Sequence, residues 1–167
     1  MLNIIAKLLK VLNSEASPRG IAWSIALAFL FAALPMFSAA KWVVILIVAV
    51  TRVNLSSFIV FSALFALIAW LFDPLLNDLG LWLLTMPALQ SFWLSVSNTA
   101  FGEALAINNT LALTTLLVGL ISLVPLYFAG IQFVRFYRVK LMPRVNQWRI
   151  VTALKSTKLY QIYQSIA

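Results

Sequence analysis

Three carboxylates, those of Asp73, Asp78 and Glu103, are the side chains of this sequence best suited to acid–base chemistry or to binding a cation. No two of them are three or four residues apart, so no helix would bring two together on one face. The sequence also has no His and no Cys, which excludes zinc sites, disulfides, Cys nucleophiles and Ser-His triads. We therefore predict no enzyme activity, no cofactor and no metal site, and we interpret the three carboxylates as loop charges or helix caps.

Three further candidate functional residues, Lys41, Arg52 and Asn54, interrupt apolar runs. A Lys or Arg at the centre of a bilayer costs roughly 2.5–3.5 kcal/mol on insertion scales, so a charge placed there usually has a use. Both Lys41 and Arg52, however, stand at the boundaries of their runs. A long basic side chain at such a boundary can reach the headgroups from its own interface, and we favour that interpretation.

The basic residues gather after the last apolar run. The net charge is +8, from 12 Lys and Arg against 4 Asp and Glu. Basic residues beside a membrane span mark the cytoplasmic side and attract anionic lipid. We expect anionic headgroups or a partner protein, and no nucleic acid, to contact the five basic residues nearest the span: Arg135, Arg138, Lys140, Arg144 and Arg149.

The composition predicts an all-α integral membrane protein. Hydrophobic residues make up 63 % and charged residues 10 % of the 167 residues, against roughly 45–50 % and 25 % in soluble domains. Two stretches, 54–72 and 111–134, are long and uncharged enough to cross a hydrocarbon core of about 30 Å. Asp73-Pro74 ends the first stretch in this interpretation, and a turn rich in Asn, Asp and Gly follows up to Gly80.

Two other apolar segments, 21–52 and 79–97, are broken by Pro35 and Pro87. Each either crosses the membrane or enters and leaves by the same face, and in an arrangement with four spans the second segment lies on or dips into the outer face. Non-helical backbone at membrane depth would need protein around it. Each broken segment precedes one clean span, and the two spans run in opposite directions. This hydropathic similarity suggests an inverted repeat.

The domain organisation follows from the charges. We expect an amphipathic interfacial helix at 1–16, a membrane domain at 17–134 and a basic, helical, cytoplasmic tail at 135–167. Both termini are basic, so both are predicted on the cytoplasmic side of a bacterial inner membrane.

Short motifs spread from residue 17 to about residue 140 carry a family resemblance: Ser17-Pro18, Ile21-Ala22, Pro35, Arg52 with Asn54, Phe72-Asp73-Pro74, Leu79-Gly80, Leu84-Thr85 and Asn108-Asn109-Thr110. They resemble a bacterial membrane family known as domain of unknown function 2062, in a compact gamma-proteobacterial branch. The sequence has Asp-Pro where that family usually has Asn-Pro, and its first helix is rich in Ala and Phe rather than Gly. The family has no established activity, so the resemblance implies no site. In this branch the protein is typically encoded beside a larger envelope protein, which implies such a partner.

Two hypotheses for function remain. In the first, the chain is a small inner-membrane subunit or anchor for a larger envelope protein, serving lipid transport between membranes. In the second, it is a stand-alone transporter or lipid-scrambling unit built on paired re-entrant hairpins.

Overall fold

The structure is a computed structural model that describes residues 17–51 and 53–141. The expected helix at 1–16, together with Arg52, Arg144 and Arg149, lies outside the described residues. Within those two ranges the structure has helices and no strand, which confirms the predicted all-α class. The helices are α2 (Pro18–Ala33), α3 (Ala39–Val50), α4 (Leu55–Thr85), α5 (Gln90–Ser97), α6 (Ala100–Ala104) and α7 (Thr110–Phe136), and the π-helical turn η1 (Tyr137–Leu141) continues α7.

Side-chain caps explain where most of these helices begin. Asn54 Oδ1 accepts the Ser57 N–H at 2.8 Å, and Asn109 Oδ1 accepts the Ala112 N–H at 2.9 Å. Ser17 and Ser38 cap α2 and α3 in the same way, each three residues before its donor. An oxygen at this position satisfies a backbone donor that has no partner inside the helix.

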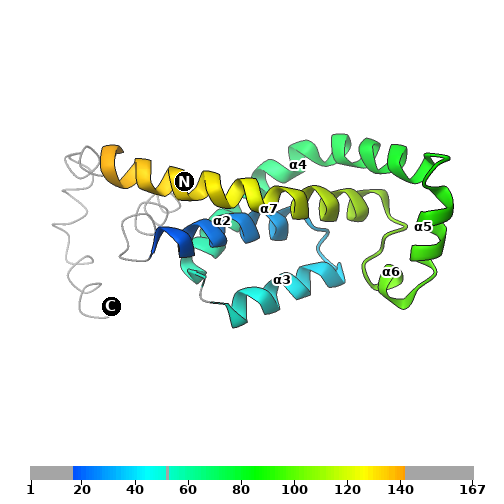
Figure 1. Cartoon of the computed structure of the whole chain (residues 1–167), viewed down its shortest axis with the longest axis horizontal. Helices are drawn as coiled ribbons and strands as arrows, with labels where there is room; N and C mark the ends of the chain where they lie inside the picture. The colour runs from blue at the N-terminus through cyan, green and yellow to red at the C-terminus, as the bar shows by residue number, and fades with distance from the viewer. Residues whose placement is uncertain (1–16, 52, 142–167) are drawn as a thin grey trace.

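α2 forms the core of the bundle. It lies between α4 and α7, running in the same direction as α4 and opposite to α7 (Figure 1). Half of its residues are buried, and Ile21, Ala22, Ala26 and Ala28 are completely so. Its small residues allow a close approach of α7, because a Cβ added at Gly130 would lie 3.1 Å from Ala22 Cα.

The two predicted spans are long apolar helices that are mostly exposed. α4 and α7 are the two described helices that are long and apolar enough to cross a membrane. Only 17 % of the most apolar stretch of α4 and 28 % of that of α7 is buried. Most of the apolar surface of these two helices is therefore left uncovered by the described part of the chain.

The prediction that the helix ends at Asp73-Pro74 is wrong, since α4 continues through Pro74 to Thr85. Proline removes one backbone donor, and the remaining hydrogen bonds of the helix can bridge that loss. The polar residues interpreted as a turn pack against α7 instead. Asn77 Oδ1 accepts a hydrogen bond from the Thr110 hydroxyl, and a side chain at Gly80 would collide with the Thr110 carbonyl.

The two proline-broken segments pack differently. α2 and α3 form a hairpin whose loop contains Pro35, and they contribute much of the core. The segment 79–97 instead supplies the end of α4 and the short helix α5, which has no buried residue. The inverted repeat inferred from hydropathy has no counterpart in this packing.

Candidate functional site

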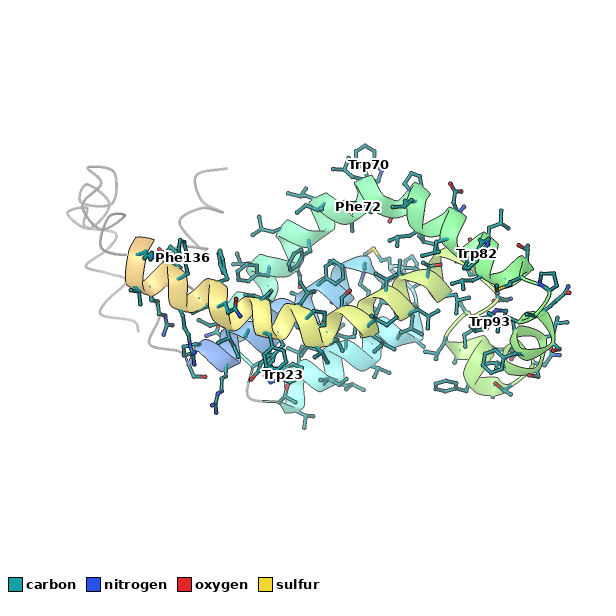
Figure 2. The ribbon with its side chains drawn as sticks, turned by 45° about the horizontal axis from the view of Figure 1, so that its top comes forward. Trp23, Trp70, Phe72, Trp82, Trp93 and Phe136 are labelled. Atoms are coloured by element: carbon teal, nitrogen blue, oxygen red, sulfur yellow. The ribbon has the colours of Figure 1, made fainter. Side chains whose placement is uncertain are left out.

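The described basic residues lie mainly at one end of the molecule. Arg19 is in the first turn of α2, and Arg135, Arg138 and Lys140 lie at the end of α7 and in η1. These helices are antiparallel and meet at Ala22 and Gly130, so the start of α2 lies beside the end of α7. Phe136 marks this end in Figure 2. The positive charges therefore form one basic end, defined here by these four residues.

The described acidic residues lie away from the basic end. Asp73 and Asp78 are in the second half of α4, and Glu103 is in α6. Asp73 and Asp78 thus belong to a helix, so interpreting them as loop charges is wrong, whereas Glu103 stands in the first turn of α6, where a negative charge favours the helix. None of the three has a side-chain hydrogen bond or ion pair within the described chain, and no group of three potential metal ligands forms there.

Lys41 closes the hairpin between α2 and α3. Its Nζ donates to the Leu34 carbonyl at 3.0 Å and lies 4.7 Å from the centroid of the Phe31 ring. Leu34 is the C-cap of α2, where backbone carbonyls lack helical donors and a positive charge is favourable. The charge of Lys41 is therefore used within the fold.

Asn54 joins the start of α4 to the core. Besides capping α4, its side chain accepts the Ser57 hydroxyl at 2.8 Å, and its carbonyl lies 2.9 Å from the hydroxyl of the buried Ser24. That hydroxyl is also 2.9 Å from the Gly20 carbonyl, so its proton serves two acceptors. This arrangement gives Asn54 a structural role.

At the helix break before Pro87, a tryptophan side chain supplies the missing hydrogen-bond donor. In a continuous helix the Leu83 carbonyl would accept the N–H of residue 87, which proline lacks. The indole N–H of Trp93 donates to that carbonyl instead, at 2.9 Å, and Figure 2 shows Trp93 on the segment that follows α4. At each helix break a side chain thus donates to one carbonyl at the end of the preceding helix, Lys41 to Leu34 and Trp93 to Leu83.

A groove of about 440 Å³ lies between α2 and α3, at the end of the bundle where α2 begins. Arg19, Trp23 and Leu27 form one wall, because residues four apart share a helix face. Ile47 and Thr51 of α3 form the opposite wall. The Thr51 hydroxyl donates to the Ile47 carbonyl, so its proton is already used.

Sequence reasoning assigned no functional role to Arg19, Trp93 or Ser24. The spacing of Arg19, Trp23 and Leu27 was the available signal for the groove. For Trp93 there was none, because the bond to Leu83 depends on the path of the loop around Pro87.

Comparison with known proteins gives one informative similarity. A protein of Treponema pallidum described as an uncharacterized protein is 26 % identical over 159 residues, which cover 95 % of this chain and 98 % of the relative. No protein-family model and no solved structure matches the chain. The relative thus has almost the same extent, and its description assigns no activity.

Proposed function

We propose that this chain is a multi-pass protein of a bacterial inner membrane and serves as a small anchor subunit for a larger envelope protein. The observation that carries the proposal is the exposed apolar surface of α4 and α7, which lies between a basic end and acidic residues toward the other end. An exposed apolar surface has no free-energy penalty when it faces the hydrocarbon of a membrane. Basic residues at one end of a membrane protein are typical of its cytoplasmic side.

The lengths and levels of α2, α4 and α7 support the same position for the hydrocarbon layer. The stretch 55–72 of α4 and the stretch 118–135 of α7 each measure about 26 Å at 1.5 Å per residue. Phe72 and Val118 line one hollow together with Ala33, so the end of α2 reaches the same level. The 16 residues of α2 measure about 24 Å. This layer is close to the usual thickness of about 30 Å.

The position of this hydrocarbon layer favours a hairpin 21–52 whose two helices both cross the membrane. α2 would reach the far face near Phe72, and the 12 residues of α3 would return by about 18 Å. The four residues 51–54 would span at most about 13 Å more if the chain were fully extended. Lys41 would then lie at the far interface, and both termini would be cytoplasmic with four crossings.

The hairpin-based transporter is the weaker alternative. It requires the breaks at Pro35 and Pro87 to meet near the midplane, with freed backbone groups lining a path. The Pro35 loop is level with Phe72, whereas Pro87 follows Thr85, which is 13 residues further along α4 and about 20 Å away. The carbonyls of Leu34 and Leu83 are also already bonded.

The partner would dock on the part of the chain beyond this layer, residues 74–109, which we call the cap. Several large apolar side chains of the cap are exposed, among them Phe92 at 52 %, Leu94 at 58 % and Phe101 at 69 %. Large apolar side chains that stay exposed outside the lipid are available for contact with a partner protein. An envelope protein encoded beside this chain, as the family resemblance implies, is the partner we propose.

Affinity purification in a mild detergent tests the proposal. The unchanged chain should retain one envelope protein larger than itself in constant proportion. The double variant Phe92→Ser, Leu94→Ser should lose it while remaining in the membrane fraction, because α5 has no buried residue and contributes none to the hydrophobic core of the described chain. Val139→Ser is the matched control, since Val139 is 74 % exposed at the opposite end.

Two results would contradict the anchor function. The first is a monodisperse chain without a companion at every detergent concentration that keeps it soluble. The second is equal recovery of the partner by the double variant and the control, because the cap would then not be the docking surface.

A further inference from the structure

We propose that the groove between α2 and α3 binds one anionic glycerophospholipid, with its phosphate at Arg19 and an acyl chain between Leu27 and Ile47. The inference rests on the membrane location given under the proposed function, and it does not depend on the partner protein.

The walls of the groove fit an acyl chain. They are almost entirely apolar, and the volume of about 440 Å³ falls in the range of ordinary ligand sites, about 300–1,000 Å³. Trp23 is 42 % exposed and Ile47 is 41 % exposed, so both walls are open to the surroundings. In a membrane those surroundings are lipid, and an acyl chain can enter from the side without crossing water.

The groups at the mouth fit a phosphate. Arg19 is exposed, and no side chain of the described residues bonds to it. The indole N–H of Trp23, one turn further along the same face, also has no acceptor there, while the Trp23 ring packs on Tyr127 with centroids 4.6 Å apart. A guanidinium and an indole N–H on one face are both donors, which suits an oxyanion.

The charge of the surroundings selects an anionic lipid. The acidic residues of the described chain, Asp73, Asp78 and Glu103, lie away from this end, whereas Arg135 and Lys140 lie on the adjacent end of α7 and its extension. A zwitterionic headgroup would bring its own cation into this positive field. We therefore expect preference for phosphatidylglycerol over phosphatidylcholine.

Native mass spectrometry of the full chain in detergent, titrated with each lipid, tests this site. The unchanged chain should hold one phosphatidylglycerol at concentrations where phosphatidylcholine occupancy is low. Arg19→Gln should weaken phosphatidylglycerol binding about fivefold, because the binding free energy that one basic residue contributes near an anionic lipid surface corresponds to about this factor. Ile47→Trp fills the groove and should lower the occupancy of both lipids. Arg135→Gln removes a charge at the same end that does not line the groove, and it should weaken phosphatidylglycerol binding clearly less than Arg19→Gln does.

Equal binding of the two lipids, or equal loss in Arg19→Gln and Arg135→Gln, would overturn the site, since the charge of the whole end would then explain the adducts. Displacement of the adduct by millimolar inorganic phosphate would also overturn it, because the acyl chain would then contribute nothing. A chain without any lipid adduct that still purifies with its envelope partner would refute the site and leave the anchor function standing.

Discussion

The indole nitrogen of Trp93 lies 2.9 Å from the carbonyl oxygen of Leu83, the carbonyl that Pro87 leaves without its helical donor. A proline that ends a helix usually exposes a carbonyl to water. Here a side chain six residues after the proline replaces the lost donor and fixes α5 against the end of α4. This bond is the best-defined link that orients the cap.

Removing this donor should loosen the cap. Trp93→Phe keeps an aromatic side chain but leaves the Leu83 carbonyl without its donor, which costs about 1–3 kcal/mol for a shielded group. We expect faster hydrogen exchange and faster proteolysis across residues 86–100, with the rest of the chain unchanged. Trp82→Phe is the control, because Trp82 is 56 % exposed and its indole N–H has no hydrogen-bond acceptor in the described chain. Equal protection in both variants would show that the bond does not hold the cap.

The contact between α2 and α7 predicts a sharp size limit at residue 130. A Cβ there would lie 3.1 Å from Ala22 Cα and 3.2 Å from Ala22 Cβ, and neither atom can rotate away. Gly130→Val should therefore lower stability in detergent by about 1–3 kcal/mol, measured by thermal unfolding. Ala129→Val places the same side chain on the neighbouring, exposed position and should change the midpoint little. Similar losses in both variants would mean that the two helices do not meet at Gly130.

Lys41 should act as a cap for α2 rather than as a functional charge. Lys41→Met removes both the bond to the Leu34 carbonyl and the interaction with the Phe31 ring, and we expect a loss of about 1 kcal/mol at this half-exposed position. Lys41→Arg should recover part of it. Hydrogen exchange of residues 34–41 reports the effect directly. A loss of partner binding without any change in exchange would instead assign Lys41 a functional role.

The sequence was a good guide to the long helices and to the breaks between them. Long uncharged runs predicted α4 and α7, and the prolines marked the positions where α2 and α5 are separated from their neighbours. The same reasoning ended a helix at Pro74, because it gave Asn77 and Gly80 the turn role that these residues usually have. Their actual role, contact with Thr110, depends on a helix 30 residues away and leaves no local signal.

Hydropathy also could not show which apolar helix is central. α2 and α4 are both strongly apolar, yet α2 is buried by protein while most of α4 is exposed. The distinguishing feature is size. Ala22, Ser24, Ala26 and Ala28 let neighbouring helices come close, whereas the exposed positions of α4 carry large side chains such as Leu67 and Trp70. Figure 2 shows Trp70 projecting outward from the bundle.

The most direct test of the membrane arrangement uses single cysteines, which the native sequence lacks. Ser91→Cys reports on the cap and Val139→Cys on the basic end, and both positions are exposed. A membrane-impermeant maleimide added to intact spheroplasts should label Ser91→Cys at once and Val139→Cys only after the membrane is permeabilised. Labelling of both positions from the same side, or recovery of either variant in the soluble fraction without detergent, would contradict the account.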